Sequence, residues 1–148
     1  MEILDLLKAL GFKRAANYVK TADGKIQCQR NHEWKGKKAT RGAKVYCLIE
    51  ICGSIKKVLY VGETIQAARM FQYRSNKAMA KVYKELSKKP KSNCKVEVWV
   101  CIDFENVHLA LAKHPLTIGR LGLEGILIEH FDPDWNRKKR VKKTNAVK

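Results

Sequence analysis

Acidic side chains are scarce in this chain of 148 residues: 14 Asp and Glu stand against 31 Lys and Arg, a net charge of +17. This imbalance argues against a cationic partner and favours an anionic one. Nucleic acid is the commonest such partner, because each Lys or Arg contact to a phosphate releases counterions. Residues 137–148 hold seven of the basic residues and no acid. The remaining 24 basic and 14 acidic residues still leave the body at +10, so the charge is not confined to this tail.

Long apolar runs are also missing, and no stretch is long enough to span a membrane. The acidic start, residues 1–5, lacks a signal-peptide pattern. The five cysteines form no C-x-x-C pair, and Cys28 with His32 would supply only half of a metal site. We therefore expect a cytoplasmic protein with reduced cysteines, in which Cys47 and Cys101 are strand residues.

Repeats are absent, and 45% hydrophobic residues are enough for the core of one domain. Residues 21–43 are polar and basic, with a turn expected at Asp23-Gly24. The pattern predicts an α+β fold with a small three-stranded sheet, antiparallel or mixed, flanked by helices. The expected strands are 44–51, 57–61 and 95–102, and the expected helices are 2–10, 65 to about 88, 105–113 and the apolar, buried helix 116–131.

The first two strands flank Cys52-Gly53-Ser54 and are expected to form a hairpin. If Glu50 pairs with Val58, then Leu48 pairs with Tyr60. In that register Tyr46 lies diagonal to Tyr60 on the same face of the sheet. The opposite face is apolar and consists of Val45, Cys47, Ile49 and Ile51.

Glu124 is the most unusual residue of the helix predicted over 116–131. On a helical wheel it lies between Phe131 and Ile128. A carboxylate in an apolar stripe is usually paired, protonated or bound to a metal, and a helix end or a partner arginine is the structural alternative. Arg69 and Tyr73 lie one helical turn apart and share a face.

These residues follow an order that resembles the GIY-YIG nucleases: Val45-Tyr46, then Tyr60-Val61-Gly62, then Arg69 and Tyr73, then Glu124, and a final Asp132-Pro133-Asp134-Trp135-Asn136. The resemblance covers residues 44–136 and is closest to compact phage endonuclease II proteins and GIY-YIG restriction enzymes. Lys44 stands where the first motif usually has glycine, and Tyr73 where many members carry histidine. Gly62 is expected to let the chain turn sharply from strand to helix.

The resemblance implies a metal-dependent DNA endonuclease of restriction or phage type. Glu124 would bind one Mg²⁺ or Mn²⁺, and Arg69 would hold the scissile phosphate. Tyr46 or Tyr60 would take a proton from the attacking water. Because a tyrosine with an ordinary pKa of ~10 is a poor base, the metal or Arg69 must favour its phenolate form. Tyr73 would support the phosphate or the base, and Asn136 would orient the local backbone or Glu124.

The same reading divides the chain into an N-terminal helix with a basic extension (1–43), a catalytic core (44–136) and a basic tail (137–148). Double-stranded DNA is the expected partner, and a homodimer or larger assembly would bring two sites to a duplex. The host would be a bacterial or phage-infected cell. Residues expected to contact DNA are Lys35, Lys37, Lys38, Arg41, Arg74, Lys77, Lys81, Arg137, Lys138, Lys139 and Arg140.

Three alternatives compete with this interpretation. Asp23-Gly24-Lys25 gives a lone D-x-K with no upstream acid, which is weak support for a PD-(D/E)xK nuclease. The four histidines are scattered and form no HNH site. A non-catalytic nucleic-acid-binding protein on the same fold is the alternative from a different class, and it would not need Mg²⁺ to act on DNA.

Overall fold

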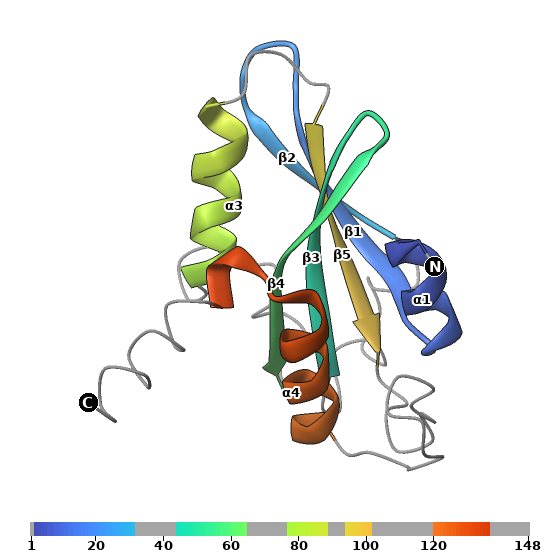
Figure 1. Ribbon diagram of the computed structural model, residues 1–148. Coiled ribbons are helices and arrows are strands. Elements are labelled where there is room, and N and C mark those ends of the chain that lie inside the picture. The colour runs from blue at the N-terminus through green and yellow to red at the C-terminus, as the bar shows by residue number, and fades with distance from the viewer. Residues whose placement is uncertain (1, 32–43, 65–76, 89–93, 102–119, 137–148) are drawn as a thin grey trace, which may run out of the picture.

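The computed structural model describes residues 2–31, 44–64, 77–88, 94–101 and 120–136 of the chain (Figure 1). The elements in chain order are α1 (Ile3–Ala9), β1 (Lys13–Lys20), β2 (Ile26–Arg30), β3 (Lys44–Cys52), β4 (Ile55–Thr64), α3 (Lys77–Lys88), β5 (Cys94–Cys101), α4 (Arg120–Phe131) and the 3₁₀ helix η5 (Asp134–Asn136).

The sheet has five strands in the order β2-β1-β5-β3-β4, and all neighbours are antiparallel. The α+β class is confirmed, but the prediction of three strands is wrong. The two missed strands, β1 and β2, lie in a polar and basic segment. β1 buries only Ala15, Ala16 and Tyr18 fully, and it is a strand because β5 and β2 pair with it on either side. Pairing partners distant in sequence therefore override a weak local pattern.

The β3–β4 hairpin has the predicted register at one end and a different one at the other. Leu48 faces Tyr60, as predicted, but Glu50 faces Lys57 rather than Val58. A β-bulge inserts one extra residue, Leu59, into β4 at this point. The one-residue shift removes the predicted pairing of Glu50 with Val58 and lets both Leu59 and Tyr60 contact the same core.

Helices cover both faces of the sheet. One face packs against α3 and the other against α1 and α4 (Figure 1). Tyr46 and Leu48 belong to the α3 side. The predicted alternation of β3 is confirmed, because the opposite side takes Val45, Cys47, Ile49 and, half-buried, Ile51.

Cys52 and Cys94 form a disulfide, which contradicts the expectation of reduced cysteines. The two residues pair directly at the end of the β3–β5 ladder, with their Cα atoms 4.2 Å apart. Neighbouring strands bring these sulfurs together, and the spacing of the cysteines in the sequence gives no sign of it. Cys28, Cys47 and Cys101 are free, and the last two are strand residues, as predicted.

The helix α4 is buried on one side only, so the prediction of a helix buried all round is wrong. Leu123 and Leu127 are buried, whereas Gly122, Gly125 and Glu129 are exposed. Of the helix predicted from 65 to about 88, residues 77–88 form α3 and residues 65–76 lie outside the described residues, as does the helix predicted at 105–113. The helix α1 ends before Gly11, as predicted. Among the helices that the structure describes, none is long and apolar enough to cross a membrane.

Candidate functional site

Tyr46 and Tyr60 lie side by side on the sheet face that packs against α3. Their ring centroids are 5.9 Å apart and the rings are tilted by 49°. The hairpin register causes this contact, because Tyr46 faces Gly62 and is therefore diagonal to Tyr60. Tyr46 is buried and Tyr60 is half-buried.

Gly62 makes room for this pair of rings. A Cβ atom at Gly62 would lie 2.6 Å from Cε2 of Tyr60 and 2.7 Å from Cζ of Tyr46, distances that real Cβ atoms do not tolerate. Gly62 lies inside β4, two residues before its end, so the predicted sharp turn at this glycine is wrong. The Tyr-x-Gly spacing has a packing reason instead. The rings of Tyr46 and Tyr60 occupy the space where a side chain at position 62 would begin, so this position must be glycine.

Asn136 completes the edge of the sheet beside the tyrosines. β4 is an edge strand of the described sheet, so one side of its backbone has no neighbouring strand among the described residues. The Asn136 side chain accepts a hydrogen bond from the Val61 N–H at 2.9 Å and donates one to the Val61 carbonyl at 3.1 Å. The carboxamide thus pairs with β4 as a strand would, and it fixes the backbone between Tyr60 and Gly62.

After α4 the chain passes from one face of the sheet to the other, and this crossing places Asn136 beside β4. Phe131 packs with the core on the α4 side, but Trp135 packs with the core on the α3 side. The chain reverses at Asp132, whose φ of 49° lies in the left-handed region that Asp tolerates better than most residues. Two further contacts hold η5: Lys57 pairs with Asp134, and Nζ of Lys81 lies 5.7 Å from the centre of the Trp135 ring.

Glu124 is half-buried on α4, and its Oε2 atom is shielded from solvent. Leu123 and Leu127 anchor α4 against the sheet face opposite the tyrosines. Figure 1 shows α4 lying alongside the C-terminal half of β4, the part that carries Tyr60 and Gly62. The carboxylate is therefore carried by the element next to the tyrosine-bearing strand.

Glu97 is the fully buried carboxylate of the described segments, and its structural role explains its burial. It accepts a hydrogen bond from Nε1 of Trp99 at 2.9 Å and lies 3.1 Å from Nζ of Lys95 and 3.5 Å from Nη1 of Arg14. Three donors satisfy its charge, which is the usual condition for burying a carboxylate.

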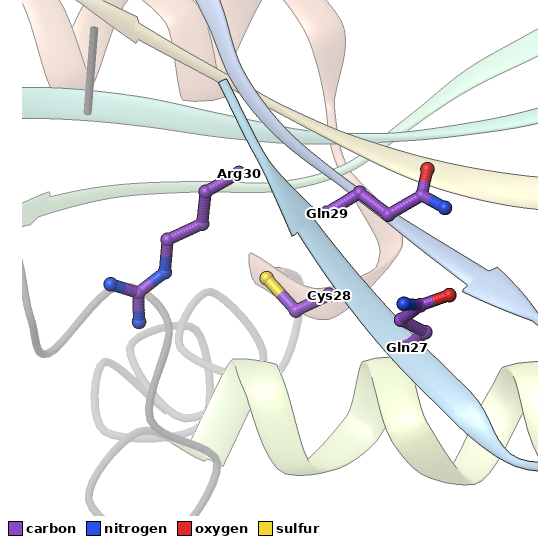
Figure 2. A pocket seen from close by; sticks show the side chains of 4 residues that line it. All are labelled: Gln27, Cys28, Gln29 and Arg30. Atoms are coloured by element: carbon purple, nitrogen blue, oxygen red, sulfur yellow. The ribbon is translucent and has the colours of Figure 1, made fainter. Parts of the chain in front are cut away.

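A hollow of about 600 Å³ lies at the other edge strand, β2, and is lined by Gln27, Cys28, Gln29 and Arg30 (Figure 2). Cys28 pairs across the β1–β2 ladder with Tyr18. Burial and the neighbouring Cys28 thiol raise the pKa of Tyr18 above its usual value, so this phenol stays protonated. Tyr18 is therefore a core residue, and Tyr46 is buried in the same core, with Tyr60 half-buried against it.

The structure brings together three of the predicted site residues, Tyr46, Tyr60 and Asn136, whereas Glu124 lies on α4, which packs against the opposite face of the sheet. The predicted DNA contacts Lys77 and Lys81 are exposed on α3. Sequence reasoning missed the space that Gly62 provides and the packing of Trp135. The other predicted residues lie outside the described segments: Lys35, Lys37, Lys38, Arg41, Arg69, Tyr73, Arg74, Arg137, Lys138, Lys139 and Arg140.

A metal at this site would have few ligands from the described segments, which hold no group of three or more His, Cys, Asp or Glu side chains suited to a metal ion. Mg²⁺ commonly binds through one or two carboxylates and completes its octahedron with water and substrate phosphate oxygens. A single carboxylate, Glu124, fits that habit.

Comparison with protein-family models, with curated proteins and with solved structures gives no match to this chain.

Proposed function

We propose that the protein is a metal-dependent DNA endonuclease that hydrolyses phosphodiester bonds. The observation that carries this proposal is the contact between Tyr46 and Tyr60 above Gly62, in a chain with a net charge of +17. The cluster supports the resemblance of the sequence to the GIY-YIG nucleases, because the spacing of that motif has a physical function here. Two phenols held against each other in a strongly basic protein, one buried and one half-buried, suit a phosphodiester substrate.

In the proposed reaction, one of the two tyrosines, as a phenolate, takes a proton from the attacking water. The water oxygen forms a new bond to phosphorus while the bond from phosphorus to the leaving oxygen breaks. The leaving oxygen takes a proton from solvent water and the tyrosine returns its proton to solvent, so the products are a phosphomonoester and a hydroxyl group. Arg69 would hold the phosphate through its two-pronged guanidinium, with Tyr73 in support. Asn136 keeps the strand between the tyrosine and the glycine in place.

Glu124 would hold a single Mg²⁺, or Mn²⁺ in its place, together with phosphate oxygens and water. When bound, the metal supplies positive charge that stabilises the leaving oxygen and the crowded phosphate. The carboxylate's partial burial supports this role, because a shielded oxygen attracts a cation more strongly than a solvated one does.

Cleavage of supercoiled plasmid tests the proposal. The wild type is expected to cut with Mg²⁺ and not with EDTA, and Glu124→Ala is expected to abolish cutting. Of Tyr46→Phe and Tyr60→Phe, the variant that removes the base should lose roughly 10²- to 10⁴-fold in rate. Tyr83→Phe is the matched control, since Tyr83 is a half-buried tyrosine on the same side of the sheet, in contact with Tyr18. No cutting by a folded, DNA-binding wild type would favour the non-catalytic alternative.

Cutting of both strands would be easiest with two sites, so we also propose a homodimer or a larger assembly on DNA. Sedimentation with and without a duplex checks this point. A monomer that only nicks plasmid would contradict the assembly without contradicting the hydrolysis.

A further inference from the structure

Four lysines form a single stripe along the exposed side of α3. Lys77, Lys81, Lys84 and Lys88 are all exposed, and their spacing of four, three and four residues places them within an arc of about 60°. The helix buries Ala78, Met79, Val82 and Leu86 on its other side. We call these four lysines the α3 stripe.

Repulsion within the α3 stripe opposes the helix, and only Lys88, in the last turn, is placed favourably for the helix dipole. Like charges three or four residues apart repel and destabilise a helix by a few tenths of a kcal/mol per pair. The single acid of α3, Glu85, approaches Lys88 only to 3.9 Å in an exposed pair, and such pairs contribute little. A stripe with this cost needs an explanation from outside the helix, and a row of negative charges would supply it.

An anionic membrane surface is a poor fit for the stripe. Helices that lie on membranes place large apolar residues such as Leu, Phe or Trp beside their cations, where they enter the lipid. On α3 the large apolar residues are buried against the sheet, and Ala80 and Ser87 are exposed beside the lysines. The backbone of a nucleic acid needs no such apolar partner, because its binding is electrostatic.

The stripe begins beside the candidate site and leads away from it. Near its start, Lys81 lies over the Trp135 ring, and the next residue, Asn136, binds Val61 between Tyr60 and Gly62. Near its end, Nζ of Lys20 donates to the Ser87 carbonyl at 3.1 Å, next to the turn between β1 and β2. Figure 1 shows α3 running from η5 toward that turn. At 1.5 Å per residue the stripe is about 16 Å long, which matches about five steps of a duplex at 3.4 Å each.

We propose that the α3 stripe is a docking surface for the sugar-phosphate backbone of duplex DNA, holding about five base pairs on one side of the tyrosine cluster. The choice of duplex DNA as partner rests on the proposed function. Such contacts position a duplex without reading its sequence, so they set affinity and register rather than specificity.

The test is fluorescence anisotropy with a labelled 20-base-pair duplex in EDTA, over a series of NaCl concentrations. Lys84→Gln with Lys88→Gln removes two stripe charges that lie away from Trp135. If each lysine neutralises one phosphate, the slope of log K against log salt becomes less steep by about 1.8. The arginine versions, Lys84→Arg with Lys88→Arg, should retain the wild-type slope.

The control is Lys8→Gln with Lys56→Gln, which gives the same net charge. Lys8 lies over Trp99 and Lys56 pairs with Glu2, both on the α1 side of the sheet. This variant should keep the wild-type slope. An unchanged slope in the stripe variant, an equal change in the control, or binding to phosphatidylserine vesicles in place of duplex would each overturn the proposal. The binding assay contains no Mg²⁺ and therefore does not depend on cleavage. If the nuclease proposal fails but the stripe binds DNA, plasmid stays uncut in the cleavage assay while the stripe variant still changes the salt slope.

Discussion

At the scale of single residues, the tyrosine cluster depends on what Gly62 lacks. Two rings occupy the space where a side chain would begin, so the strand can carry no Cβ at that position. The glycine therefore acts on the site through packing, since its backbone conformation is ordinary for a strand and requires no left-handed angle. A substitution at Gly62 can therefore test whether this position needs glycine for its missing side chain or for its flexible backbone.

Gly62→Ala is expected to displace one or both tyrosine rings and to lower the free energy of unfolding by about 1–3 kcal/mol, the usual cost of overpacking. Gly125→Ala is the matched control, because a Cβ atom at this position would have nothing within 4 Å. The substitution also removes a glycine from inside α4. That change should stabilise the protein by up to about 1 kcal/mol. Urea unfolding of both variants measures the difference, and equal stabilities would contradict the packing role.

Asn136 illustrates how one side chain replaces a missing strand. Asn136→Ala leaves the N–H and the carbonyl of the buried Val61 without this partner. The expected loss is about 1–3 kcal/mol per buried group left unsatisfied. Asp134→Ala removes the partly exposed ion pair with Lys57 and should change stability by less than about 1 kcal/mol. Denaturant melts compare the two, and hydrogen exchange at the Val61 amide should quicken only in the Asn136 variant.

The three free cysteines should differ sharply in reactivity. Cys47 and Cys101 are buried, whereas Cys28 is half-buried beside the hollow at β2. Burial, and to a smaller extent the neighbouring Cys101, raises the pKa of the Cys47 thiol, so the reactive thiolate stays scarce at neutral pH. Iodoacetamide followed by mass spectrometry should label Cys28 first in the native protein, and Cys47 and Cys101 only in denaturant. Early labelling of Cys47 would show that the strands around it open readily.

At the scale of elements, the sequence predicts those segments whose local pattern agrees with their final environment. β3 alternates between two apolar faces, and the pairing of Leu48 with Tyr60 follows from that alternation. The same logic fails for β1, whose charged start and few apolar residues resemble a loop until β5 and β2 pair with it. It also fails at Leu59, because a bulge is a property of two paired strands and leaves no mark in either one alone.

The disulfide between Cys52 and Cys94 joins the ends of two elements, β3 and β5, that are 42 residues apart in sequence. A crosslink over a loop of this length restricts the unfolded chain and typically stabilises a protein by about 2–4 kcal/mol. Cys52→Ser with Cys94→Ser should therefore lower the melting temperature by several degrees. Dithiothreitol should lower that of the wild type to a similar value and leave the double variant unchanged. A wild type insensitive to the reductant would mean that the bond does not form in solution.

At the scale of the whole molecule, the sequence gives the net charge directly, and the structure shows where part of that charge lies. A net charge of +17 does not identify a surface, but the fold places four lysines in one row next to the tyrosine cluster. The candidate site is predictable to the same partial degree. Its residue types and their order are visible in the sequence. The packing of two rings over Gly62 and the pairing of Asn136 with an edge strand can be recognised only once the sheet is assembled.

This excess of positive charge should also make the free protein less stable at low ionic strength. Like charges repel more strongly in the compact state than in the expanded one, and salt screens them over a Debye length that falls from about 30 Å at 0.01 M to about 10 Å at 0.1 M. The melting temperature should therefore rise as NaCl increases over that range.

Inorganic polyphosphate at equal ionic strength should raise the melting temperature further, because a ligand that binds only the folded state adds its own binding free energy. Differential scanning fluorimetry measures both effects. A melting temperature that falls with NaCl would mean that ion pairs such as Lys56 with Glu2 outweigh the net repulsion, and an equal response to both salts would mean that the lysines present no organised anion-binding surface.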